Sequence, residues 1–414
     1  MKTPLQDMLD GHSSEGELES QGTFRIDSVK ASEKLEAFQL SHQGDYLVKF
    51  LQVACELLGG PFFLRIGVFH TTAAFSASTA HLSKLASLPG ALLEGKAEPN
   101  SLLDHFATGL RGCLATTKRA DCFIDGKPFL RVKEGKTEWL GLPELSKPTS
   151  EVSLRFSRRS LLRGLKQSYL RADDHLALLD RGRFYPSPIL VDNRPIFQGW
   201  NRKLKHSRLS VANALGPFYL LEAYLEADSQ LENIIVPDNN RQDFTFREKG
   251  IYKWAISQRT TRAEWKSPTL FRITHDPPNR SRRFRCGIAL TVNSELEKMG
   301  RISFLIDGAH TDSKRIDLGI PGIHVIVSGS GLTTDLGQFQ IVEDGLYKQR
   351  VRALKARLAP VSAFLKDMTG EIRDFLKETK YQGYDPGMSR ILGPEHKRAL
   401  DKEANRISET LSLL

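Results

Sequence analysis

The longest apolar stretch of the chain, residues 46–69, restricts the fold more than any other part of the sequence. Lys49, Glu56 and Arg65 interrupt it, whereas a membrane-spanning helix needs about 20 consecutive residues that are mostly apolar. Its first half, residues 46–56, predicts a helix, and residues 62–69 predict a strand directly after it. We therefore expect a buried helix and strand in the core of a soluble protein that makes no contact with a membrane.

Composition places few limits on function. The 414 residues are enough for two or three domains, and the hydrophobic content of 40% and charged content of 26% are typical of a globular protein. The net charge of +10 permits an anionic partner. The four cysteines show neither disulfide nor metal-site spacing. Together with an acidic N-terminal region that is unlike a signal peptide, they predict a cytoplasmic protein.

Changes in pattern along the chain predict four regions. Residues 1–22 are expected to form a flexible acidic tail, and residues 23–196 a first domain of helices and strands. Residues 197–345 predict a strand-rich middle domain, and residues 346–414 predict C-terminal helices. These regions together indicate an α+β protein.

Local signals predict further elements in the first domain. Asp125-Gly126 lies between two apolar runs, which is the strongest short signal for a hairpin. Asp173 or Asp174 is a candidate N-cap. The remaining predictions are helices at 31–38, 77–85, 102–116, 161–169 and 174–180, a polar loop containing Pro89 and Gly90, a half-buried strand at 152–156 and a hairpin at 189–196.

The middle domain contains short apolar runs bounded by Gly, Pro, Asn and Asp, a pattern typical of strands. Asp307-Gly308 predicts a further turn in this region. The predicted strands are at 218–225, 251–256, 286–292, 302–306 and 323–327.

The C-terminal region contains an apolar seam at alternating spacings of three and four residues, which predicts a long helix. Pro360 interrupts the seam and predicts a kink or a break. The seam has two interpretations: docking on the preceding sheet, which we favour, or a homodimer or partner interface. Its members are Val351, Leu354, Leu358, Val361, Leu365, Met368, Ile372 and Phe375.

The order of predicted elements over residues 24–196 resembles the GHKL ATPase fold, most of all its heat-shock chaperone branch. Residues 105–112 resemble the glycine-containing segment that ends the lid and binds phosphate at a helix N-terminus, and Gly109 is retained. Thr149 matches the threonine before the strand under the nucleotide, and residues 183–192 match the strand that begins the next domain. The resemblance implies a Bergerat-type α/β sandwich, with helices over a mixed sheet. A strand-rich transducer-like α+β domain and a C-terminal helical segment would follow it.

The residues that perform chemistry in that family are replaced. The resemblance places Lys49 where the family has a catalytic glutamate and Val53 where it has a magnesium-binding asparagine. Residues 70–76, after the first strand, lack the aspartate and glycines of the adenine box. We therefore predict no catalytic residue and no metal ligand in this pocket. ATP binding without hydrolysis, through Lys49, Gly109 and Thr149, stays open.

Three functions follow from these observations. The first, which we favour, is a non-hydrolysing scaffold or adaptor with a protein partner in a multi-protein assembly. The second is a divergent but active ATP-dependent chaperone whose carboxylate is Glu56, two helical turns after Lys49. The third is a nucleic-acid-associated protein that uses a basic cluster. The arginines of that cluster are Arg280, Arg282, Arg283 and Arg285.

Overall fold

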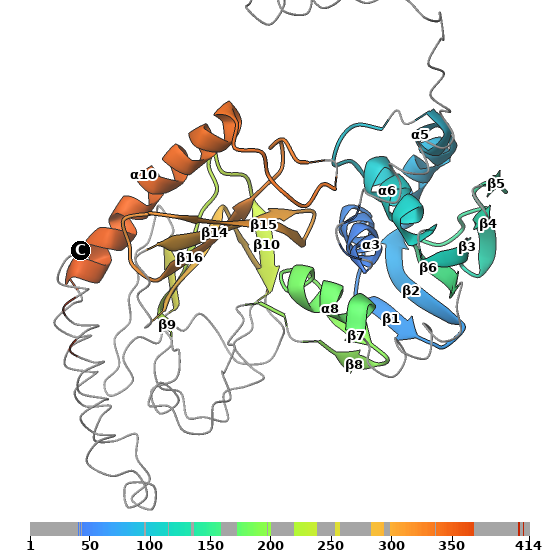
Figure 1. Ribbon diagram of the computed structural model, residues 1–414, viewed down its shortest axis with the longest axis horizontal. Helices are drawn as coiled ribbons and strands as arrows, with labels where there is room; N and C mark the ends of the chain where they lie inside the picture. The colour runs from blue at the N-terminus through green and yellow to red at the C-terminus, as the bar shows by residue number, and fades with distance from the viewer. Residues whose placement is uncertain are drawn as a thin grey trace, which may run out of the picture.

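Two sheets, each with helices packed on it, lie side by side in the structure (Figure 1). The predicted tail at 1–22 and the predicted helices at 31–38 and 161–169 lie outside the described residues. The computed structural model describes residues 40, 42, 44–94, 97–114, 116–133, 136–158, 172–196, 198–199, 219–237, 253–256, 283–293, 299–335, 337–367, 405 and 409.

The first sheet has eight strands in the order β5-β4-β3-β6-β2-β1-β7-β8. It is mixed, because β1 pairs with β7 in parallel while its other pairs are antiparallel. Buried and exposed residues alternate along β1 and β6, as expected when one face of a sheet is covered and the other faces solvent. The bounds are β1 Phe62–Ile66, β2 His70–Ser78, β3 Thr117–Ile124, β4 Lys127–Lys133, β5 Lys136–Trp139, β6 Thr149–Arg158, β7 Ile189–Val191 and β8 Arg194–Pro195.

Helices cover the buried face of this sheet. The predicted helix at 46–56 is α3 (Asp45–Glu56), which packs against α6 (Leu102–Leu114), β2 and α8 (Ala172–Arg181). Phe50 of α3 contacts Phe106 and Phe156, with ring centroids 5.5 and 5.3 Å away. Helices over a mixed sheet form the α/β sandwich that the sequence predicted, and the arrangement is consistent with a Bergerat-type fold.

The second sheet has six strands in the order β11-β9-β13-β16-β14-β15, beside a ribbon of β10 and β12. All five predicted strands of this region have a counterpart in these sheets, which confirms its strand-rich character. The bounds are β9 Tyr219–Leu225, β10 Ile234–Pro237, β11 Lys253–Ile256, β12 Arg283–Cys286, β13 Ile288–Asn293, β14 Gly300–Ile306, β15 Ala309–Ile316 and β16 Ile323–Ser328.

Both predicted Asp-Gly turns close hairpins. Asp125 and Gly126 connect β3 to β4 with φ values of +48° and +76°, and Asp307 and Gly308 connect β14 to β15 with values of +47° and +72°. Positive φ at both central residues is the geometry that twists correctly between antiparallel strands. The second of these turns points toward α3 and becomes part of the candidate site.

Several sequence predictions were wrong in detail. The predicted helix at 77–85 is split, because β2 extends to Ser78 and is followed by α4 (Thr79–Leu82) and the 3-10 turn η1 (Ser83–Ser87). The predicted loop around Pro89 is helical in α5 (Leu88–Glu94), where proline fits because the first turn needs no backbone donor. Asp173 and Asp174 lie within the first turn of α8 and are not its N-cap.

The long C-terminal helix α10 (Gly345–Asp367) packs on the second sheet. Pro360 does not split it; this residue is exposed, so the carbonyl it leaves without a helical partner faces water. The seam members within α10 are all buried in the core of the second sheet, in agreement with docking on that sheet. They are Val351, Leu354, Leu358, Val361 and Leu365. Met368, Ile372 and Phe375 lie outside the described residues, and a homodimer through this seam stays a prediction.

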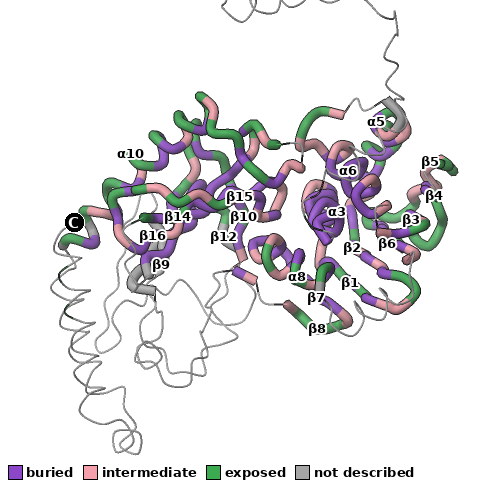
Figure 2. The backbone as a smooth tube through the Cα atoms, viewed as in Figure 1, coloured by how far each residue is buried: buried purple, intermediate pink, exposed green. Residues whose placement is uncertain are grey.

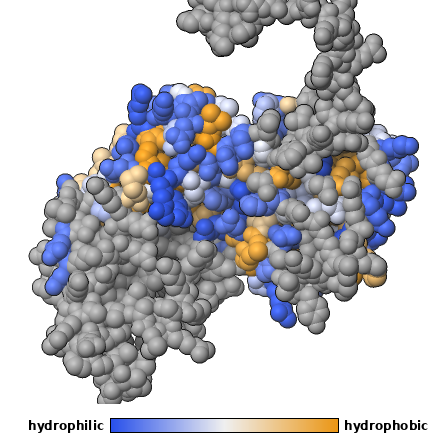
Figure 3. Space-filling view, in the orientation of Figure 1, coloured by the Kyte–Doolittle hydropathy of each residue, from blue (hydrophilic) through white to orange (hydrophobic). Residues whose placement is uncertain are grey.

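Among the described residues, no helix is both long and apolar enough to pass through a membrane. In the same part of the chain, large exposed apolar side chains are few and scattered, with Phe69 and Leu58 the most exposed. On the face seen in Figure 3, hydrophobic and hydrophilic residues are interspersed.

Candidate functional site

A polar face of α3 points away from the hydrophobic core between the first sheet and its helices, which we call the first core. Asp45, Lys49, Gln52 and Glu56 are spaced by four, three and four residues, so they share one side of the helix. The opposite side carries apolar residues into the first core. Every residue from Asp45 to Ala54 is nevertheless buried (Figure 2). The polar face is therefore covered by other parts of the protein, and these come largely from the second sheet.

Lys49 lies at the centre of this polar face and is fully buried. Its Nζ donates to Oε1 of Gln338 over 2.7 Å and lies 4.5 Å from the ring centroid of Phe339. Burial lowers the pKa of Lys49 to about 7, although the nearby carboxylates of Asp104 and Asp307 oppose this shift. The position where the family has a catalytic base is thus occupied by a hydrogen-bond donor that already has a partner.

The covering loop lies between Asp335 and Gln340, beyond the second sheet. Oδ1 of Asp335 accepts hydrogen bonds from the backbone N–H groups of Phe339 and Gln340, both over 3.0 Å. Gln338 has a φ of +58°, a conformation that is uncommon for residues other than glycine. We call residues 335 and 337–340 the plug loop, because its tip reaches the polar face of α3.

The ring of Phe339 packs between the side chains of Lys49 and Arg181. Arg181 comes from α8, and its guanidinium lies 4.2 Å from the ring centroid of Phe339. Lys49 comes from α3 and contacts the same ring. Arg181 also pairs with Asp45 over 3.3 Å and donates to the backbone oxygen of Thr311 over 2.7 Å. Cation–π contacts of this kind are stronger when they are removed from water. The plug loop is therefore held by α3 and α8.

The N-terminus of α6 carries a carboxylate. Oδ2 of Asp104 accepts from the backbone of Asn100 over 2.8 Å and from Nε2 of Gln338 over 2.6 Å. An acidic side chain stabilises the positive end of a helix. The resemblance expects a phosphate near this end of α6. In the structure, Asp104 places a negative charge there, and Gln338 of the plug loop bonds to its carboxylate.

The structure brings two of the three predicted pocket residues together. Gly109 lies where α6 crosses α3, and a Cβ there would be 3.1 Å from Cβ of Lys49 and 3.1 Å from the Phe50 ring. Thr149 is exposed at the start of β6, opposite Ser78. The backbone N–H of Ser78 bonds to the oxygen of Leu57, beyond the C-terminal end of α3. Because Leu57 follows Lys49 by about two helical turns, Thr149 lies near the C-terminal end of α3 and not beside Lys49.

The positions expected for the adenine box lie in β2 and face a buried ion pair. Thr71 donates to Oδ2 of Asp174 over 3.2 Å, and Arg158 pairs with the same oxygen over 3.3 Å. The hydroxyl of Tyr46 donates to Oδ1 of Asp174 over 3.4 Å. Asp174, which comes from α8, is thus surrounded by donors from three other elements, as a buried carboxylate requires.

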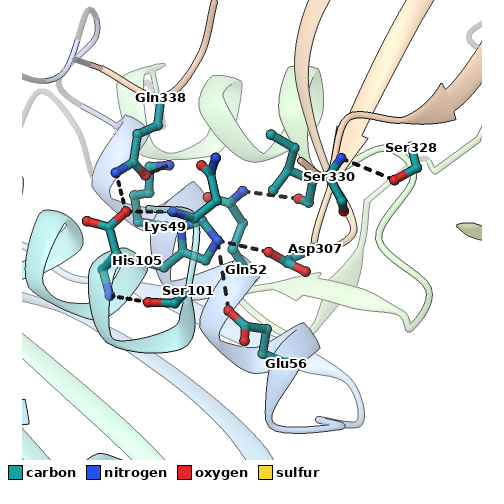
Figure 4. Close-up of polar contacts among 12 residues, drawn as sticks. Lys49, Gln52, Glu56, Ser101, His105, Asp307, Ser328, Ser330 and Gln338 are labelled. Carbon is teal, nitrogen blue, oxygen red and sulfur yellow. Dashed lines mark hydrogen bonds and ion pairs between the residues drawn. The ribbon is translucent and has the colours of Figure 1, made fainter. Parts of the chain in front are cut away.

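A cluster of three metal-ligating side chains lies at the end of the polar face of α3 (Figure 4). Nε2 of His105 lies 2.9 Å from Oδ2 of Asp307 and 3.9 Å from Oε1 of Glu56. Burial lowers the pKa of His105, with the hydrogen bond to Asp307 opposing the shift. Burial also raises the pKa of Glu56 to about 8, and the charge of Asp307 adds to this. We call these three residues the Glu-His-Asp cluster.

Sequence reasoning identified Glu56 and the Asp307-Gly308 turn separately but missed the cluster. No local pattern links His105 to either of them, since they come from α3, α6 and the β14–β15 turn. Gln52 extends the same contact by donating from Nε2 to the backbone oxygen of Ile306 over 3.0 Å. Of the predicted basic cluster, Arg285 is exposed on β12, while the side chains of Arg280, Arg282 and Arg283 lie outside what the structure describes. Binding of nucleic acid there stays a prediction.

Comparisons with known proteins give similarities among solved structures. No protein-family model matches the chain, and no curated protein matches it. A crystal structure of the B subunit of DNA gyrase from Myxococcus xanthus is similar, with a TM-score of 0.35, 10% sequence identity, and coverage of 80% of this chain and 94% of that chain. A similarity at this level carries no functional argument. The chain is defined by its own geometry as an α+β protein with a helix-covered mixed sheet and a second strand-rich region.

Proposed function

We propose that this chain is a GHKL-type protein, similar to heat-shock chaperones, that does not hydrolyse ATP and serves as a scaffold or adaptor in a multi-protein assembly. The observation that carries the proposal is the closure of the polar face of α3 by the plug loop. Lys49 is fully buried and bonded to Gln338, and Phe339 is packed over it.

The chemistry of the closed site supports this proposal. A general base must lie within reach of the water that it activates, whereas Lys49 is fully buried and its Nζ already bonds to Gln338. Magnesium requires oxygen ligands, whereas Val53 is apolar and fully buried in the first core. The carboxylate of Asp104 at the start of α6 would repel a phosphate. Binding of ATP without hydrolysis would first require the plug loop to leave α3.

The direct test is a measurement of phosphate release and of thermal unfolding with ATP and Mg²⁺. We expect no release above the blank and no shift in the unfolding midpoint. A variant with Phe339→Ala and Gln338→Gly loosens the plug loop and tests whether closure alone prevents binding. Turnover by the wild-type protein that exceeds the blank would overturn the proposal.

A divergent active ATPase is the second candidate, because Glu56 shares the polar face with Lys49 and has a raised pKa of about 8. Such a carboxyl holds a proton near neutral pH and accepts one at higher pH. If turnover is found, Glu56→Gln should abolish it under this second function. Asp125→Asn is the matched control and should not change it, because Asp125 lies in the β3–β4 turn.

The adaptor role requires a protein partner. Gentle extraction followed by size-exclusion chromatography of the full chain tests it: we expect elution in a complex larger than the 46.5 kDa chain. Elution at the size of one chain from both native extract and purified protein would contradict the adaptor role.

A further inference from the structure

The Glu-His-Asp cluster joins two helices that cover the first sheet to a turn of the second sheet. Glu56 ends α3, His105 lies in the first turn of α6, and Asp307 is the first residue of the β14–β15 turn. One ligand atom from each residue lies within 4.8 Å of the other two. Four-coordinate zinc takes nitrogen and oxygen ligands at about 2.0 to 2.2 Å, so two ligands of one ion lie at most about 4.4 Å apart. The distances from Nε2 of His105, 2.9 Å to Asp307 and 3.9 Å to Glu56, fall within that limit.

The state of the ligand atoms also fits a cation. Oε1 of Glu56 is buried without a hydrogen-bond partner, while the backbone N–H of Leu102 interacts with the same carboxyl group. His105 is fully buried, and its Nε2 points between the two carboxylates. Each of the two carboxyl groups disfavours ionisation of the other, so both are charged together only when a positive charge lies between them. A divalent ion would supply that charge.

We propose that Glu56, His105 and Asp307 bind one divalent transition-metal ion, with zinc as the best fit, and that the ion fastens the second sheet to α3 and α6. Imidazole together with carboxylate oxygens is a ligand set suited to zinc and its neighbours, and the imidazole disfavours calcium and magnesium. Three protein ligands leave a fourth position for water. The site is independent of the proposed adaptor function and lies apart from the position of Val53, where the resemblance would expect magnesium.

The cluster offers conservative variants that remove a ligand and keep the fold. Asp307 has a φ of +47°, a conformation that asparagine tolerates. Asp307→Asn therefore removes a carboxylate charge and preserves the turn. Glu56→Gln does the same on α3. Asp125→Asn is the matched control, because Asp125 occupies the equivalent position of the β3–β4 turn with a φ of +48°.

The experiment uses the full chain, first treated with a chelator and then dialysed with Zn²⁺ and a thiol reductant. Elemental analysis and calorimetry measure stoichiometry and affinity, and thermal unfolding measures stabilisation. We expect about one Zn²⁺ per chain for the wild-type protein and for Asp125→Asn, with a higher unfolding midpoint. Asp307→Asn and Glu56→Gln should weaken binding by at least about tenfold, since changes to groups around a metal cost about 10- to 100-fold even outside the direct ligands.

Cobalt gives an independent readout. Four-coordinate Co²⁺ absorbs visible light. We expect a visible absorption band from Co²⁺ bound to the wild-type protein, and we expect Asp307→Asn to lose it. Equal Zn²⁺ binding by the wild-type protein and both ligand variants would mean that other histidines and cysteines bind the metal, and it would overturn the proposal. Absence of Zn²⁺ binding by the wild-type protein would overturn it as well.

Discussion

The helices α3 and α10 both pack on a sheet, but they differ in what covers their other side. In α3 every residue from Asp45 to Ala54 is buried, including two charged side chains and one amide. In α10 a single stripe is buried, and the charged residues Arg352 and Lys355 between its members are exposed. A helix with one solvent face leaves its polar groups to water, whereas a helix covered on both faces must find a partner for each of them. The joint between the two sheets is therefore where the specific polar contacts gather.

The largest effect is expected at the plug loop. Phe339→Ala removes a buried ring that packs between Lys49 and Arg181, and truncations of buried aromatic residues cost about 3 to 5 kcal/mol. Chemical denaturation should therefore show a large loss of stability. Phe69→Ala is the control, because Phe69 is 69% exposed, and it should change stability by less than about 0.5 kcal/mol. Equal effects of the two variants would show that the plug loop does not cover α3 in solution.

The lysines of the two helices give the most direct comparison. Lys49→Ala leaves Oε1 of Gln338 without its donor and opens space beside Phe339, so we expect a loss of about 2 to 4 kcal/mol. Lys355 is exposed on α10, and Lys355→Ala should stay within about 0.5 kcal/mol of the wild-type value. The same denaturation curves measure both. A neutral Lys49→Ala would show that the polar face of α3 is open to water.

Glycine substitutions sharpen the comparison at the helix crossing. Gly109→Val places methyl groups against Lys49 and Phe50, which lie 3.1 Å from a Cβ at this position. Overpacking of this kind costs about 1 to 3 kcal/mol. Gly90 lies in α5 with nothing within 4 Å of its added Cβ, so Gly90→Val should be close to neutral. Thermal unfolding of both variants checks the prediction, and an unchanged midpoint for Gly109→Val would argue against close packing of α3 on α6.

The smallest of these effects, counted per pH unit, is expected in the pH dependence of stability. The pKa of Glu56 is raised from 4.5 to about 8 in the folded protein. The folded state then holds a proton that the unfolded state has lost, so this contribution to stability is complete below about pH 4.5 and disappears as pH rises through about 8. The pKa of Lys49 is lowered from 10.5 to about 7. Between those values the unfolded state binds more protons, and the contribution of Lys49 to stability rises with pH.

Glu56→Gln should therefore remove the decline between about pH 4.5 and 7 and keep the rise above about pH 8. For one proton the slope is at most about 1.4 kcal/mol per pH unit. Denaturation midpoints across this range, measured with a chelator present, test the prediction. A decline in the variant as steep as in the wild-type protein would assign it to other groups.

Features with a local signal could be predicted from the sequence. The helix at 46–56, the strand that begins at Phe62, the Asp125-Gly126 hairpin and the Asp307-Gly308 turn follow from apolar spacing and turn chemistry. The structure contains them, although the strand predicted over 62–69 ends at Ile66. The edge strand β15 was missed, because its sequence is largely polar and half of it faces solvent. The break between α4 and η1 was also missed, because an apolar pattern does not distinguish one helix from several short turns.

The contacts of the candidate site had no such signal. Lys49 and Gln338 are 289 positions apart, Gln52 and Ile306 are 254 apart, and His105 and Asp307 are 202 apart. Each is set by how the second sheet meets α3, which no single segment encodes. Lys49 and Glu56 stood out as a charge within an apolar helix and as a carboxylate on the same side, and the sequence predicted that much of the site.

The dependence of α3 on the plug loop has a consequence for synthesis. The ribosome delivers the N-terminal residues first, so the first sheet can form while Gln338 and Phe339 are still unmade. During that interval Lys49 has no Gln338 to receive its hydrogen bond, and one side of the newly formed helix stays wet. Folding of the N-terminal half is thus complete only when the plug loop has been synthesised. A chain truncated before residue 335 would leave the polar face of α3 exposed, where chaperones and proteases could recognise it.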